Sequence, residues 1–270
     1  MKKFLKVIKL ILTILFFIYT TLLLSFMFLS PKETRFDFAG NLQGVYLSQT
    51  VFNTLTFQYP NYSDAYFEQS VPFNKRGEFA RGFELLNNAV ELDPSLHLGY
   101  RGYIKLRFLR DYKNALIDFK RLDSLTPNFV DAPWGEDIDF LRGECYFGIK
   151  DYSKAIICFT RSIENNTEDW VDLNTFVYLG LCEYELGNYE KAISEHNRAL
   201  KQSLNTPEAY FGLAQAYLKL NNIDKANEHI LNAELNIVYK RNDPYKEFQN
   251  ELYLSEIHQF KQELMKGYEK

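Results

Sequence analysis

The first thirty residues combine a basic start with a long apolar run. Leu10 to Leu29 are twenty consecutive residues without a charged side chain. A helix of twenty residues is about 30 Å long, which matches the hydrocarbon core of a bilayer. The pattern therefore predicts a single-pass transmembrane signal-anchor in residues 1–30, with the membrane segment at 10–29.

A cleaved secretory signal is the alternative, since such signals also begin with lysines followed by apolar residues. Their apolar region spans roughly 7–15 residues and ends at small side chains. Here the run is longer and ends with the bulky residues at 26–29, so we favour an uncleaved anchor. Four lysines precede the span and no net charge follows it within residues 32–37, so the positive-inside rule places the N-terminus in the cytoplasm. The rest of the chain is then exported, into the periplasm if the cell is a Gram-negative bacterium.

The remaining residues repeat one apolar pattern five times. A small residue recurs at offsets of 33, 40, 37 and 34, and a large side chain follows it by four positions. With a further, mostly small residue three positions later, this spacing marks one face of a helix. A second helical pattern and a tight turn precede each row. The small and large residues are Gly82 and Leu86, Ala115 and Phe119, Ala155 and Phe159, Ala192 and His196, and Ala226 and Ile230.

These positions resemble the tetratricopeptide repeat (TPR) family, whose 34-residue helix-turn-helix unit carries aromatic, Leu-Gly, Tyr, Ala, Phe and Pro residues at similar intervals. The resemblance covers five units, at residues 63–240. It implies an all-α fold, a TPR-type α-solenoid of about five helix-turn-helix repeats. Gly82 and His196 depart from the family pattern, and the third and fourth units lack a closing proline at Thr167 and Leu204.

Two segments flank the predicted repeats. Residues 31–62 are expected to form a linker and an N-terminal half-repeat, with one helix from Gln49 to Tyr59 that ends at Pro60. Residues 241–270 are expected to form a C-terminal capping helix that starts at Pro244 and ends near Met265.

Composition and motifs narrow the functional classes. Without its four N-terminal lysines the chain has 31 − 4 = 27 basic and 35 acidic residues, a balance that argues against nucleic-acid binding. Its three cysteines do not predict a disulfide framework. We find no nucleotide-binding, hydrolase or metalloprotease motif and no metal-ligand spacing among the four histidines. The sequence therefore predicts no enzymatic activity, no metal and no cofactor.

The family resemblance implies a concave surface lined by the first helix of each repeat. Nearly all the residues that it places there are apolar or aromatic, and Arg107 would be the single anchor for an acidic group. Such a surface suits an apolar or aromatic peptide or helix. Alternatively, these side chains pack against neighbouring first helices, or the C-terminal helix fills the groove. The predicted groove residues are Phe67, Tyr100, Ile104, Arg107, Phe140, Phe147, Val177, Leu181, Tyr184 and Phe211.

An acidic loop at residues 131–139 is the largest insertion in the repeats. Its carboxylates and Trp134 could contact a cation or a basic peptide. In the other interpretation the acids begin the next helix, where they favour the helix dipole, and Trp134 packs on the preceding repeat.

Together these patterns predict a membrane-anchored protein–protein interaction scaffold with a protein or peptide partner. The alternative is a structural, self-associating component of a larger envelope assembly.

Overall fold

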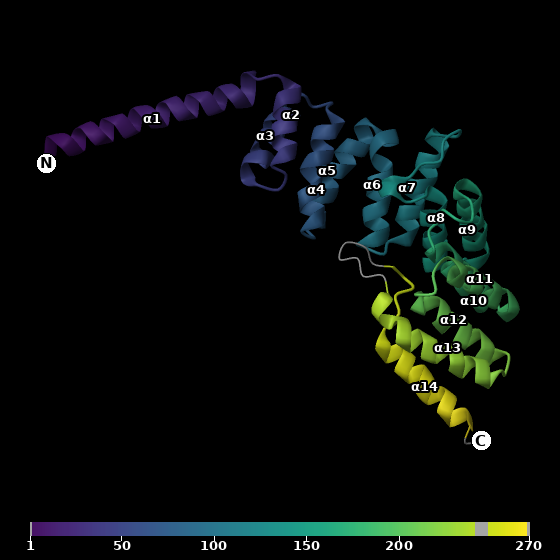
Figure 1. The fold of residues 1–270 in the computed structure, drawn as a ribbon. Helices are drawn as coiled ribbons and strands as arrows, with labels where there is room; N and C mark the ends of the chain where they lie inside the picture. Colours follow the sequence, from purple (N-terminus) through teal and green to yellow (C-terminus); the bar gives the residue numbers. More distant parts are fainter. Residues whose placement is uncertain (1, 241–247, 269–270) are drawn as a thin grey trace. The chain divides into compact units, whose positions relative to one another are not determined.

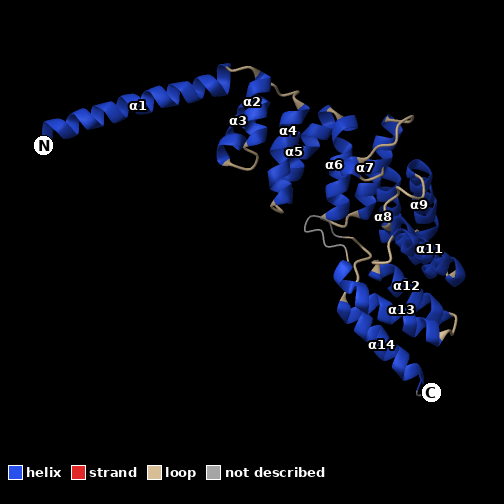
Figure 2. Ribbon diagram, in the orientation of Figure 1, coloured by secondary structure: helices blue, strands red, loops and turns tan. Residues whose placement is uncertain are grey.

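A computed structural model describes residues 2–240 and 248–268. All the regular elements in these ranges are helices, as Figures 1 and 2 show. The contacts divide the chain into two units, residues 1–97 and residues 98–270, and each unit is considered separately. The expected all-α solenoid of helical hairpins is confirmed.

The first unit begins with the apolar helix. The elements are α1 (Lys2–Leu29), α2 (Lys32–Asn41), α3 (Tyr46–Gln58), α4 (Ser63–Lys75) and α5 (Phe79–Leu92). By length and composition, the stretch Phe4–Leu29 of α1 could cross a membrane, with a mean hydropathy of 2.4. The hairpin of α4 and α5 is the first of the five predicted repeats.

The end of α1 packs against α2 and α3. Met27 is buried in a cluster with Ala39 and Phe52. The buried guanidinium of Arg35 donates a hydrogen bond of 2.6 Å to the carbonyl of Met27, and Gln58 donates one of 3.3 Å to the carbonyl of Phe28. These bonds satisfy carbonyls that the last turn of a helix leaves without partners.

Helix α2 occupies part of the region where the sequence predicts a linker. It escaped the sequence analysis because four of its ten residues are charged and no apolar stripe marks a buried face. Its buried residues are Ala39 and the whole side chain of Arg35, and Phe36 and Phe38 pack partly buried against the same cluster. Residues 31–62 therefore contain two helices, α2 and α3, rather than one.

The second unit contains four more hairpins and a final helix. The first helices of these hairpins are α6 (Pro94–Arg107, which begins in the first unit), α8 (Ile138–Gly148), α10 (Asn174–Glu185) and α12 (Pro207–Lys219). Their partners are α7 (Tyr112–Leu125), α9 (Tyr152–Asn166), α11 (Tyr189–Gln202) and α13 (Ile223–Asn236). Two short 3-10 turns, η1 (Pro133–Gly135) and η2 (Ile237–Tyr239), and the last helix, α14 (Leu254–Tyr268), complete the unit.

Aromatic rings lie against glycines where the two helices of a hairpin meet. The rings of Phe119, Phe159 and His196 are buried, and they face Gly102, Gly143 and Gly180 respectively. These positions allow the backbone of the first helix to approach the ring of the second helix. These glycines lie on the first helices, and the large residues of the sequence pattern, Phe119, Phe159 and His196, supply the rings that pack against them.

Replacing Gly143 with alanine is expected to lower the free energy of unfolding by about 1–3 kcal/mol. An alanine Cβ there would lie 2.5 Å from the Phe159 ring, which is fully buried and stacked on Tyr178. Gly40→Ala is the control, because a Cβ at Gly40 meets nothing within 4 Å. Alanine at that site should leave stability unchanged or raise it by up to about 1 kcal/mol. Urea unfolding of both variants checks this prediction, and equal stabilities would contradict it.

The C-terminal helix begins later than the sequence predicts. The expected start at Pro244 lies outside the described residues, and α14 starts at Leu254. Residues 248–253 are not helical, although Phe248 and Leu252 are both buried. The apolar spacing of this segment therefore reflects contacts with other helices, which are described below.

Candidate functional site

The structure separates the ten predicted groove residues into two groups. Phe67 lies in the first unit, where its ring stacks on His97 with centroids 5.0 Å apart, and it is therefore not placed with the others. The nine remaining residues lie in the second unit. Five of the ten are buried, and these are Tyr100, Ile104, Arg107, Phe140 and Val177. The other five are half-buried, and these are Phe67, Phe147, Leu181, Tyr184 and Phe211.

Five of these residues, contributed by α8, α10 and α12, line one pocket of about 210 Å³. Gln215 and four glutamates also contribute to its wall, together with part of the C-terminal segment, and no lysine or arginine is among its lining residues. The pocket thus has an apolar floor and an acidic rim. The five predicted residues are Phe147, Val177, Leu181, Tyr184 and Phe211, and the glutamates are Glu185, Glu208, Glu251 and Glu256.

Phe140 belongs to the hydrophobic core of the repeats and not to this pocket. Its side chain is 2 % exposed, and its ring lies 5.8 Å from Phe159 and 6.0 Å from Tyr178 between centroids. The interpretation that such residues pack between neighbouring helices therefore describes Phe140.

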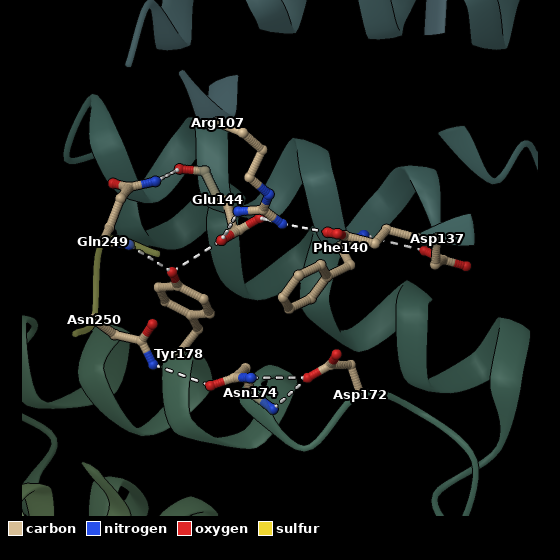
Figure 3. A network of polar contacts seen from close by, with 10 residues as sticks. Arg107, Asp137, Phe140, Glu144, Asp172, Asn174, Tyr178, Gln249 and Asn250 are labelled. Carbon is tan, nitrogen blue, oxygen red and sulfur yellow. Dashed lines mark hydrogen bonds and ion pairs between the residues drawn. The ribbon is translucent and has the colours of Figure 1, made fainter. Parts of the chain in front are cut away.

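Next to the pocket, Arg107 and Glu144 form a buried ion pair (Figure 3). The Nη1 atom of Arg107 donates to Glu144 Oε1 at 2.7 Å, and Nη2 lies 2.6 Å from Oε2. Glu136, which comes from the acidic loop, also accepts a hydrogen bond from Arg107. Arg107 therefore binds acids, as the sequence suggests, but they are two carboxylates of its own chain.

Burial and charge act in opposite directions on this pair. Burial acts to lower the pKa of Arg107, but Glu144 and Glu136 together raise it above its ordinary value. Burial raises the pKa of Glu144, although Arg107 opposes the shift. A charge held in such a site depends on its partner, because desolvation otherwise favours the neutral form.

The C-terminal segment meets this network at Tyr178. The Tyr178 hydroxyl donates to Glu144 Oε1 at 2.9 Å and accepts the backbone N–H of Gln249 at 3.2 Å. The side-chain amide of Gln249 donates to the carbonyl of Glu144 at 2.8 Å. Figure 3 shows Gln249 beside Glu144 and Tyr178, and Asn250 beside Asn174.

This segment contacts the first helix of four successive hairpins. The Phe248 ring lies 4.5 Å from the guanidinium carbon of Arg107 in α6. Gln249 contacts α8 and α10, and Asn250 donates to Asn174 of α10 at 3.2 Å. Leu252 is buried in the cluster that includes Ala214 of α12. Residues 248–252 therefore occupy part of the groove, whereas the sequence analysis considered only the C-terminal helix for that position.

Sequence reasoning did not pair Glu136 or Glu144 with Arg107, and it did not place Tyr178 or Gln249 in the site. A signal for one of them was present: Glu144 is a lone acid at a groove position of one repeat, and Arg107 is a lone base at a groove position of the repeat before it. Opposite charges on adjacent, otherwise apolar helices predict an ion pair. No periodicity indicates Gln249, because it lies outside the repeats.

The acidic loop begins a helix, as the second interpretation of its sequence proposes. Asp137 accepts hydrogen bonds from the backbone N–H groups of Asp139 and Phe140, and thereby caps α8. The Trp134 ring lies 4.9 Å from the Tyr100 ring and 6.0 Å from the Tyr103 ring, so Trp134 packs on the preceding repeat. It nevertheless remains 52 % exposed.

The cysteines occupy buried positions in the repeats. Cys145, Cys158 and Cys182 are all free thiols, and burial raises the pKa of each, to about 11 for Cys158. Raised values disfavour the reactive thiolate. Within the described ranges, no group of three or more His, Cys, Asp or Glu side chains is arranged to hold a metal ion.

The hairpins and groove define an α-solenoid of helical repeats. The chain contains TPR repeats: a family profile described as TPR repeat matches residues 180–221, and one described as Tetratricopeptide repeat matches residues 140–169. A comparison with curated proteins gave no match.

Solved structures support the same fold. MamA 41-end from Desulfovibrio magneticus RS-1 is similar with a TM-score of 0.57 and 18% identity, over 67% of this chain and 97% of that one. YrrB, described as a TPR protein with an unusual peptide-binding site, has a TM-score of 0.55 and 18% identity. The match covers 68% of this chain and 91% of YrrB. PilW, described as a type IV pilus biogenesis factor, has a TM-score of 0.59 and 12% identity. The match covers 78% of this chain and 95% of PilW. At these identities the likeness shows the fold alone.

Proposed function

We propose that this protein is a non-catalytic scaffold, anchored in a membrane by α1, that binds an apolar or aromatic segment of a partner protein in the concave groove of its repeats. The observation that carries the proposal is the pocket between α8, α10 and α12, where Phe147, Leu181, Tyr184 and Phe211 remain half-buried. Half-buried aromatic side chains in a concavity provide large contact areas for a partner.

The anchor determines where the partner is held. Residues 1–30 form the cytoplasmic start and the transmembrane span, and residues 63–240 form the repeat domain on the other side of the membrane. Support comes from the length and hydropathy of α1 and from the lysines before it. Anchoring confines scaffold and partner to one plane and thereby raises their effective concentration. The likeness to PilW, a pilus biogenesis factor, is consistent with a role in the cell envelope.

A second candidate function is self-association through the opposite face of the repeats. Ile117 of α7 and Ile157 of α9 occupy equivalent positions in adjacent repeats and are 61 % and 54 % exposed. Exposed aliphatic side chains on neighbouring second helices could pair with a second copy of the chain.

A matched pair of variants tests the two functions in the full-length protein. Leu181→Ser with Phe211→Ser alters the pocket, and Ile117→Ser with Ile157→Ser alters the second helices. We expect affinity capture from solubilised native membranes to yield a partner that the first variant loses by at least tenfold and the second retains. The captured partner is then purified and its affinity for each chain is measured directly.

Melting of each variant controls for loss of folding. A partner lost equally from both variants would contradict groove recognition. A molecular mass that falls only in the Ile117→Ser, Ile157→Ser chain would support self-association instead.

A further inference from the structure

The segment at 248–252 has the features of a bound peptide. It is not helical, it crosses the first helices of four hairpins, and its contacts use an aromatic ring, side-chain amides and one buried leucine. Extended peptides in binding grooves are held by the same combination of backbone hydrogen bonds and side-chain pockets. Here Tyr178 accepts the backbone N–H of Gln249, and the network of Arg107 and Glu144 receives the side chains of Phe248 and Gln249.

One position of the segment does not match its surroundings. Glu251 lies at the pocket whose rim also carries Glu185, Glu208 and Glu256. Burial and then the charge of Glu251 raise the pKa of Glu208, while Lys240 opposes the shift. The Glu251 carboxylate accepts a hydrogen bond from Tyr253 at 2.6 Å and forms an ion pair with Lys240, whose Nζ lies 3.9 Å away. Glu251 therefore adds a fourth carboxylate to the acidic rim, and Lys240 is its cationic partner.

We propose that residues 248–252 occupy the groove in cis as a weak substitute for the partner, which is an extended segment with an aromatic residue, a carboxamide residue and, at the position of Glu251, a basic residue. This inference rests on the proposed function and specifies the chemistry of the partner. The aromatic ring would stack on the Arg107 guanidinium, and the carboxamide would donate a hydrogen bond to the carbonyl of Glu144. A lysine or arginine would pair with the glutamates of the acidic rim.

Cis occupancy also regulates access to the groove. A partner binds only the fraction of molecules whose groove is empty, so its apparent affinity equals the intrinsic affinity multiplied by that fraction. A partner with a base at the position of Glu251 gains an attraction to the three remaining glutamates, in place of the ion pair that Glu251 forms with Lys240. It can therefore displace residues 248–252, whereas an unrelated apolar peptide competes poorly.

The test uses two labelled peptides and three full-length chains. One peptide has the sequence of residues 248–253, and the other carries Glu251→Lys. The chains are the wild type, Phe248→Ala with Gln249→Ala, and the control Gln259→Ala, which replaces an exposed glutamine of α14. We expect both peptides to bind the double variant at least tenfold more tightly than the wild type or the control. The Glu251→Lys peptide should bind about threefold to tenfold more tightly than the native peptide, with a difference that shrinks as salt is added.

A direct measurement of the segment accompanies the binding data. Hydrogen exchange at the backbone amide of residue 249 should be slow in the wild type, where Tyr178 accepts that hydrogen bond, and fast in the double variant, where the segment leaves the groove. If melting shows that the double variant is not folded at the assay temperature, Gln249→Ala alone is used. Its expected gain in peptide affinity is about threefold. Equal peptide affinities for all folded chains, or no preference for the Glu251→Lys peptide, would overturn the proposal.

The outcomes separate this inference from the proposed function. A captured partner that depends on Leu181 and Phe211 but is not displaced by either peptide would overturn the inference and leave the scaffold function intact. Tight peptide binding by the double variant, without any groove-dependent partner from membranes, would contradict the scaffold function and leave cis occupancy supported.

Discussion

Replacing Arg107 with methionine is expected to lower the free energy of unfolding of the repeat domain by about 3–5 kcal/mol. The variant removes the charge that compensates Glu144, whose side chain is fully buried. An unpaired carboxylate in that site must either remain charged without hydration or take up a proton. Denaturant unfolding at neutral pH measures the loss.

The deficit of the Arg107→Met variant should depend on pH in a defined direction. Burial already raises the folded-state pKa of Glu144, and removal of Arg107 takes away the interaction that lowers it. When folding raises the pKa of a group, that group stabilises the folded state fully at pH values below its pKa in the unfolded chain. The contribution is lost as the pH rises through the pKa of the folded state. The free energy of unfolding of the variant should therefore be closest to that of the wild type near pH 4 and furthest below it near pH 8.

The double variant Arg107→Met with Glu144→Met is the control. It removes both charges, and replacing a buried ion pair by apolar side chains is often neutral or stabilising. Most of the lost stability should therefore return. A double variant as unstable as the single variant would show that the uncompensated charge of Glu144 is not the cause of the loss.

Acidification from pH 6.5 to 4 is expected to cost the wild-type domain about 3 kcal/mol through His196. The imidazole is fully buried and neither ring nitrogen has a hydrogen-bond partner among the described residues. Burial alone lowers the pKa of His196 from 6.5 to about 4. Because folding lowers this pKa, the ring is neutral in both the folded and the unfolded chain above pH 6.5 and costs no stability there. The free energy of unfolding falls as the pH drops from 6.5 towards 4.

His196→Leu should remove this dependence, because leucine has a similar volume and no titrating group. The ring lies between Gly180 and Gly212, where a larger side chain would not fit. Stability of the variant at pH 7 should equal or exceed that of the wild type, since no polar atom is then buried without a partner. Thermal melts at several pH values compare it with His258→Leu, in which an exposed histidine is replaced. Parallel pH profiles for the wild type and His196→Leu would contradict the prediction.

Much of the solenoid could be predicted because its signals are local. Each repeat places small residues where two helices touch and large residues where repeats stack, so a period near 34 appears in the sequence itself. The same regularity placed Phe147, Val177, Leu181, Tyr184 and Phe211 on one surface, and these five line a common pocket. Helix α2 escaped because its two buried residues, Arg35 and Ala39, do not form an apolar stripe.

The groove could not be completed from the sequence because its remaining parts are distant in the chain. Gln249 bonds to the carbonyl of Glu144 across more than a hundred residues, and no periodicity connects them. Composition likewise could not show whether Arg107 faces a partner or its own chain. Local patterning thus determines which helices form and which faces are apolar. Burial, charge pairing and the path of residues 248–252 depend on three-dimensional proximity, and only the folded chain defines them.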